Sequence, residues 1–83
     1  MAEIAQTSLV ERIARVLAGQ AHSSNAQGSD PSAGTKVDLV WPEYTDQAVA
    51  VLHAIREPDA AAAAAGDVAT WHRMIEAAIA NAE

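Results

Sequence analysis

The 83-residue chain is predicted to fold as an all-α bundle, and three observations lead to that prediction. Apolar residues recur at helical spacing in three separate stretches, which is the main signal of amphipathic helices. Proline and glycine stand at the ends of these stretches, where they begin or stop helices. One short stretch of alternating apolar residues is too little to make a sheet. We therefore expect one domain, residues 1–83, with three longer helices and a short alanine-rich helix.

The first helix is predicted over about residues 4–19. Ser8 and Glu11 fit the S-x-x-E capping box, so the strongest part of the helix should start at Ser8. Gly19 is expected to close it. Arg12 and Arg15 should face solvent. The expected apolar face consists of Leu9, Ile13, Val16 and Leu17, with Val10 and Ala14 beside them.

A loop is predicted over about residues 20–36, because this stretch lacks periodicity and concentrates Ser, Gly, Asn and Pro. A connection of that length is usually either flexible or functional, and a flexible loop is our prediction. Residues 36–41 then alternate polar and apolar side chains. They are expected to form a short extended segment laid over the helices.

The remaining helices are predicted over about residues 42–57, 58–65 and 67–82. Pro42 suits a first helical turn, and Pro58 should stop the helix before it. Gly66 should cap the alanine-rich helix, and Asp67 is a good N-cap for the last one. Apolar stripes lie on both longer helices: Tyr44, Ala48, Val51, Leu52 and Ile55 on one, and Val68, Trp71, Ile75, Ala78, Ile79 and Ala82, with Met74 adjacent, on the other.

These stripes predict how the bundle packs. The ridge from Tyr44 to Ile55 and the ridge from Val68 to Ile79 are expected to press against the first helix. The aromatic residues Trp41, Tyr44 and Trp71 are expected in the core rather than on a binding platform.

Charge narrows the range of functions. The net charge is −6, and most of the excess carboxylates follow Lys36. Binding to nucleic acid requires a basic stripe, and the sequence has none. A charged partner should therefore be a protein with a basic surface. Modest acidity that only keeps the protein in solution is the alternative. The carboxylates predicted to contact such a partner are Asp38, Glu43, Asp46, Glu57 and Asp59.

The sequence contains little that points to chemistry. Without cysteine, disulfides and thiolate metal sites are excluded. His53 with Glu57, and His72 with Glu76, are spaced i, i+4 and are expected to be surface pairs rather than metal ligands. No catalytic residue, cofactor or metal site is predicted, and we expect no enzyme activity. The sequence shows neither a secretory signal nor an apolar run of about 18 residues that would span a membrane. A cytoplasmic protein is expected.

Several motifs carry a resemblance to a known group of proteins. They are Trp41-x-x-Tyr44, the run from Ala48 to Pro58 ending in Arg-Glu-Pro, Ala65-Gly66, and Trp71-x-x-Met74-Ile75-x-x-Ala78, together with Val10 to Arg15. The pattern resembles small uncharacterised phage- and prophage-type proteins of alphaproteobacteria. The resemblance implies a mobile-element setting, in which small acidic proteins often block host machinery, anti-CRISPR proteins among them. That group usually has a large apolar residue in the turn before Gly66, where this chain has only alanine.

Two functional hypotheses follow. In the first, the protein is a phage-borne inhibitor that binds a host defence or nucleic-acid-handling protein in the host cytoplasm and blocks DNA binding by charge mimicry. In the second, it is an accessory subunit that self-assembles, as a homodimer for example, through surplus apolar surface on the first and last helices. Because 21 of the residues are alanine and add little burial, a lone monomer is expected to be marginally stable.

Overall fold

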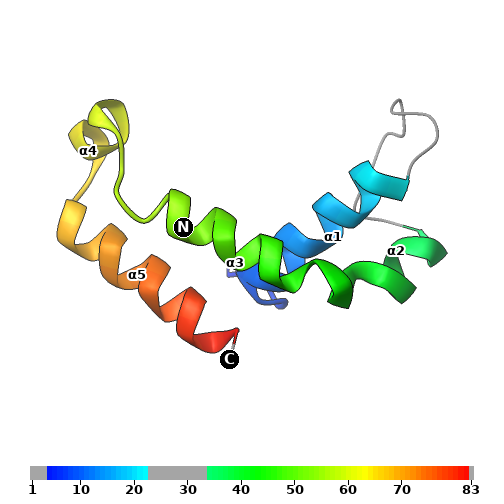
Figure 1. Cartoon of the computed structure of the whole chain (residues 1–83). Coiled ribbons are helices and arrows are strands. Elements are labelled where there is room, and N and C mark those ends of the chain that lie inside the picture. The colour runs from blue at the N-terminus through cyan, green and yellow to red at the C-terminus, as the bar shows by residue number, and fades with distance from the viewer. Residues whose placement is uncertain (1–3, 23–33, 83) are drawn as a thin grey trace.

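The computed structural model describes residues 4–22 and 34–82, and within them the fold is all-α, as predicted (Figure 1). No strand occurs in these two segments. The elements in chain order are α1 (Leu9–His22), α2 (Thr35–Val40), the 3₁₀ helix η1 (Trp41–Tyr44), α3 (Thr45–Ala54), α4 (Ala60–Ala65) and α5 (Val68–Asn81). Most of the loop predicted over residues 20–36 lies outside the described residues.

The start of α1 is set by a side-chain cap. The backbone N–H of Glu11 donates to Ser8 Oγ at 3.0 Å, which confirms one half of the predicted capping box. The carboxylate of Glu11 does not complete the box, because it accepts a hydrogen bond from Arg15 instead. The prediction that the helix reaches back to residue 4 is therefore wrong, and α1 begins at Leu9.

The predicted end of α1 at Gly19 is also wrong, because the helix continues to His22. Gly19 is buried within α1. The last turn is supported by a contact with η1, since Tyr44 Oη lies 3.0 Å from His22 Nε2 and the two rings meet edge to face. Tertiary contacts thus outweigh the low helix propensity of glycine.

The stretch predicted as extended, residues 36–41, is helical instead. It forms α2 and the beginning of η1, with Pro42 in the first turn of η1. Val37, Val40, Trp41 and Tyr44 fall at i, i+3, i+4 and i+7, and all four are buried or half-buried. Leu39, which the alternating pattern would have paired with Val37, is 73% exposed. Helical spacing, not alternation, describes the buried side of this segment.

The second half of the chain follows its predicted punctuation with shorter helices. After η1, α3 begins at Thr45 and ends at Ala54, several residues before Pro58, so the predicted helix 42–57 was too long. Asp59 caps α4 by accepting the N–H of Ala62 at 2.9 Å. Asp67 caps α5 by accepting the N–H of Thr70, as predicted.

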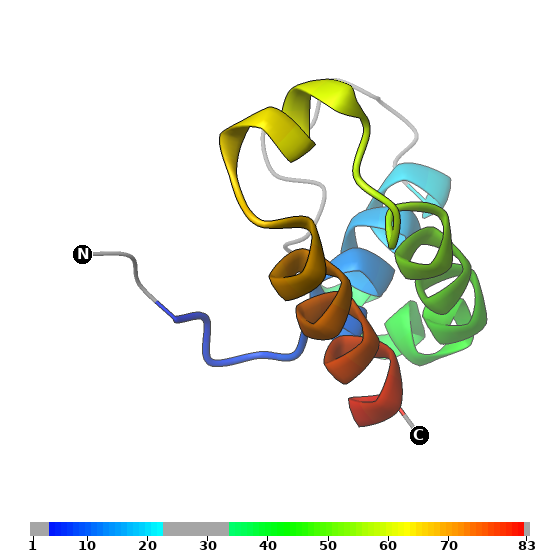
Figure 2. The same cartoon turned by 90° about the vertical axis from the view of Figure 1, so that its left-hand side faces the viewer.

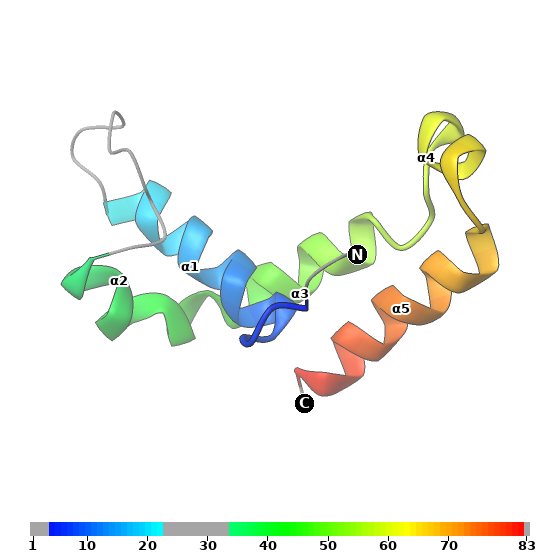
Figure 3. The ribbon, with the colours of Figure 1, turned by 180° about the vertical axis from the view of Figure 1, so that it is seen from behind.

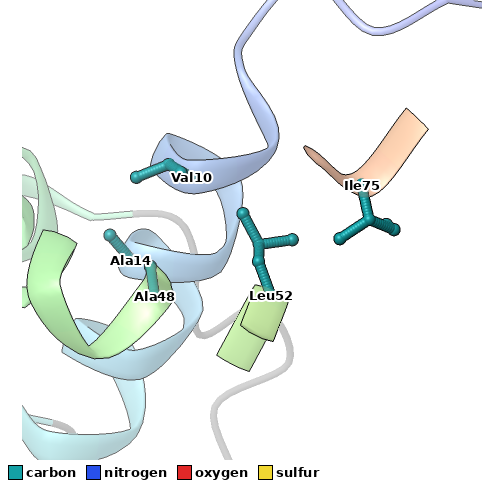
Figure 4. Packing of buried hydrophobic residues seen from close by; sticks show 5 residues of the cluster. All are labelled: Val10, Ala14, Ala48, Leu52 and Ile75. Atoms are coloured by element: carbon teal, nitrogen blue, oxygen red, sulfur yellow. The ribbon is translucent and has the colours of Figure 1, made fainter. Parts of the chain in front are cut away.

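The core lies where α1, α3 and α5 meet (Figure 4). Ala14 of α1 and Ala48 of α3 are both fully buried, so the backbones of these two helices come close together. Leu52 is the only large side chain among the described residues that is fully buried, and it points into the space between α1 and α5. Val10 and Ile75 close the cluster on either side of it.

Two parts of the predicted packing need correction. In α1 the buried side is formed by Val10, Ala14 and Ala18, whereas the predicted Leu9 and Val16 are exposed. Small alanines take the inner positions because α3 approaches closely there. The four residues that bound the two ridges divide between core and surface: Tyr44 and Ile79 pack against the core cluster, while Ile55 and Val68 are exposed.

The helices are arranged unevenly along the molecule. The helices α1 and α2, with η1 and α3, form one packed body (Figures 1 and 3). In contrast, α4 stands at the opposite end from α2, and α5 runs from it back below α3 (Figure 1). The view turned by 90° shows α5 beside α3, with α4 above it (Figure 2). Among the described residues, no polar or charged side chain is buried, so the core is entirely apolar.

Replacing Leu52 by alanine tests the core. The variant should lower the free energy of unfolding by about 2–5 kcal/mol, because the cavity forms where three helices meet. Denaturant titration followed by circular dichroism measures this loss. Leu39→Ala, at an exposed leucine of α2, should change stability by no more than about 0.5 kcal/mol. Equal losses in the two variants would contradict the assigned core.

Candidate functional site

The five carboxylates predicted to contact a partner are all exposed, but the structure divides them between two places. The first place, called the η1 acidic group, holds Asp38 of α2, Glu43 of η1 and Asp46 in the first turn of α3. The second, the α4 acidic group, holds Glu57 and Asp59 in the connection before α4. Residues 47–54 of α3 lie between Asp46 and the second group, a helix length of about 12 Å. They are therefore two surfaces and not one continuous patch.

Asp38 is engaged within the chain. Its carboxylate accepts a hydrogen bond from Arg15 Nη1 at 2.6 Å, and Arg15 also donates to Glu11 at 2.9 Å. The guanidinium lies 5.5 Å from the centre of the Trp41 ring. The hydrogen bond with Asp38, followed by that with Glu11, raises the pKa of Arg15. The expectation that Arg15 merely faces solvent is thus wrong, because it connects α1 to α2 and η1.

The α4 acidic group is engaged as well. Asp59 caps α4, and Glu57 accepts from Arg56 at 3.3 Å. Arg56 also reaches Glu76 of α5 at 3.4 Å, which ties the end of α3 to α5. His72 completes this group, with ring nitrogens 3.7 Å from Glu57 and 3.8 Å from Glu76.

The two predicted histidine–glutamate pairs have different outcomes. His72 and Glu76 do share a side of α5. His53 and Glu57 do not share a helix face, because α3 ends at Ala54 and Glu57 lies beyond it. Within the described parts of the chain no cluster of three or more His, Asp or Glu is arranged to hold a metal ion.

The remaining two of the five predicted carboxylates are those of Glu43 and Asp46. Among the residues that the structure describes, Glu43 and Asp46 form no salt bridge, and both are exposed. They lie three residues apart, at the junction of η1 and α3. Of the predicted set, this pair has the carboxylates most open to an external cation.

The most distinctive surface was not predicted from the sequence. A groove of about 380 Å³ opens between α4 and the first half of α5, and we call it the α4–α5 groove. Three large apolar side chains of α5 line it while partly exposed: Val68 at 47%, Trp71 at 38% and Met74 at 62%. The rest of its lining is Pro58, Ala62, Ala63, Ala65, Gly66, Asp67 and Thr70.

Trp71 forms the fixed part of this groove. Its indole N–H donates to the backbone carbonyl oxygen of Ile55 at 2.8 Å, so the polar edge of the ring is satisfied. The prediction that Trp71 belongs to the core is therefore wrong, as it is for Val68. One feature of the sequence could have indicated this surface. The helix α5 carries more large apolar residues than can pack around Ile75 and Ile79 in the core.

The other two aromatic residues fit their predicted place better. Trp41 and Tyr44 are half-buried and pack against the core cluster.

Comparison with protein-family models, with curated proteins and with solved structures found no match to this chain. In residues 4–22 and 34–82, no helix is long and apolar enough to cross a membrane.

Arg15→Ala should loosen the attachment of α2 and η1 to α1. The side chain that joins Asp38, Glu11 and the Trp41 ring is removed, so Trp41 should gain exposure to water. Iodide quenching of tryptophan fluorescence should increase. Arg12→Ala is the matched control, because Arg12 is an exposed arginine on the same helix. Identical quenching in the two variants would argue against the connection.

Asp67 should make stability depend on pH in acid. The hydrogen bond from the Thr70 hydroxyl is the main reason that the pKa of Asp67 is lowered below 3.8. The carboxylate form thus stabilises the fold at pH values above about 3.8, and that contribution is lost as pH falls through the lower folded-state pKa. Asp67→Asn keeps a cap that does not titrate, so its unfolding curves should weaken less with acid. Parallel pH profiles would contradict this assignment.

Proposed function

We propose that the protein is a non-enzymatic protein–protein interaction module that binds a basic surface of its partner. The observation that carries the proposal is the outward placement of its acids: the chain has a net charge of −6, and Glu43 and Asp46 are exposed without an ion pair in the described residues. Exposed carboxylates attract a basic partner over a distance and suppress binding to acidic ones.

The specific form of the proposal is an inhibitor carried by a phage or other mobile element. Its target is a host defence or nucleic-acid-handling protein, and its acids occupy the basic groove that would hold DNA, as in an anti-CRISPR protein. This setting is proposed from the sequence motifs alone, which resemble those of phage-type proteins. A DNA duplex carries one charge per ~1.7 Å of axis, so two carboxylates imitate only a short stretch of phosphates. Charge should therefore guide the encounter, while other contacts supply much of the affinity.

A self-assembling accessory subunit is the second candidate. Exposed Leu9 and Val16 support it, since they line an open depression on α1 with Ile13 between them. Each copy carries a net charge of −6, which opposes association at low salt. Sedimentation at tens of micromolar separates the candidates, because a monomer there contradicts self-assembly.

Affinity capture at two salt concentrations tests the proposed inhibitor. The wild-type chain should enrich a basic protein from host lysate at about 0.1 M salt and lose it at about 0.5 M, because screening weakens attraction between exposed charges. Glu43→Gln with Asp46→Asn should reduce recovery at least tenfold in the low-salt capture. DNA should compete with the wild-type chain for the captured protein.

The control must change net charge by the same amount. Glu57→Gln with Glu76→Gln also removes two negative charges, but from carboxylates already paired with Arg56. This variant should retain most of the capture. Recovery that does not depend on salt, or equal losses in both double variants, would contradict binding through Glu43 and Asp46.

A further inference from the structure

The α4–α5 groove is a second surface whose chemistry differs from that of the η1 acidic group. We infer that this groove binds the apolar face of an amphipathic helix whose polar face is basic, supplied by the partner protein. The inference rests on the proposed function in one respect, namely that the partner is a protein with basic character. It adds where the partner is held and what kind of segment is held.

The shape of the groove suits large apolar side chains. One wall, α4, consists of six alanines and has no side chain longer than a methyl group. The other wall has Trp71 and Met74, which remain 38% and 62% exposed. Small residues facing large ones leave a groove of about 380 Å³, within the usual size of ligand pockets. That space accommodates about one or two large side chains from a partner.

Each wall is a helix whose first turn is capped by a side chain. Asp59 caps α4, and Asp67 caps α5 through Thr70. The indole N–H of Trp71 is held by the carbonyl oxygen of Ile55. This hydrogen bond limits the rotation of the indole, and a half-exposed tryptophan is typical of an interaction hot spot.

The backbone around the groove favours a helix over an extended segment. Both walls are α-helices, whose backbone groups are already paired within the helix. An extended peptide would find no strand edge here to receive its hydrogen bonds. A helix satisfies its own backbone and contributes only side chains, which is the helix-in-groove mode of recognition.

Charge decides between a foreign helix and a second copy of this chain. The groove lining contains one charged residue, Asp67, and Asp59 stands beside Pro58 at its edge. Arg73 lies nearby on α5, where it donates to Thr70 Oγ1 at 3.3 Å. Two carboxylates against one cation make the surroundings acidic, like the chain as a whole. Basic flanks on the bound helix are complementary to these charges, whereas another chain of net charge −6 is repelled.

Three synthetic peptides serve as probes. The first is an amphipathic helix with a leucine stripe and lysines on its polar face. The second replaces the lysines by glutamates, and the third keeps the composition of the first but has a central proline that breaks the helix. Titration at about 0.15 M salt is followed by the indole N–H resonance of Trp71, which a Trp41→Phe variant identifies.

Met74→Glu is the variant that tests the groove. Met74 is 62% exposed, so the substitution should leave the fold intact. The lysine peptide should shift the Trp71 resonance, and Met74→Glu should weaken that binding at least tenfold. Leu39→Glu adds the same charge at an exposed leucine of α2, far from the groove, and should leave the affinity within about twofold.

Every other outcome overturns the inference in a defined way. If the glutamate peptide binds as tightly as the lysine peptide, the bound segment need not be basic. If the proline peptide binds as tightly, the segment need not be helical. Binding that survives Met74→Glu places the peptide elsewhere. Dimerisation in sedimentation that Met74→Glu abolishes makes a second copy the occupant. A captured partner that Met74→Glu retains, but the Glu43 and Asp46 double variant loses, leaves the proposed function standing without the groove.

Discussion

The close approach of α1 and α3 is the contact on which the rest of the structure depends. It is made by two alanines, Ala14 and Ala48, so the helices meet almost at their backbones. Leu52 extends from this contact and receives Ile75, which attaches α5. A core with one large fully buried side chain leaves many apolar residues outside it. That imbalance explains why a short chain both folds around α1 and α3 and presents an apolar groove.

Sequence patterns predicted the helical class and the caps at Ser8 and Asp67, because caps are local. Ser8, Asp59 and Asp67 each bond to a backbone N–H a few residues ahead. The faces were harder to predict. In α1 the inner positions are alanines, so a search for large apolar residues selected Leu9 and Val16, which are exposed. In α2 a short alternating pattern concealed the helical spacing that begins at Val37.

The candidate surfaces show the same limit. The exposure of the five acids was expected from their charge, but their local engagements depend on which helices come together. Arg15 reaches Asp38 only because α2 folds against α1, and Arg56 reaches Glu76 only because α5 runs back beneath α3. The groove could not be predicted from α5 alone, since its second wall is a run of alanines whose position depends on tertiary structure. The η1 acidic group and the α4–α5 groove thus lie at different ends of α3, and a partner that uses both must span the length of that helix.

The alanine composition of α4 has a consequence for how this protein can change. A helix with no long side chains contributes little to its own attachment, and a larger residue at Ala62 or Ala63 would fill the hollow from inside. Such a replacement would bury more apolar surface and stabilise the fold, yet it would block the groove to any ligand. Substitutions in α4 that increase stability would therefore reduce the capacity of the groove to bind a ligand.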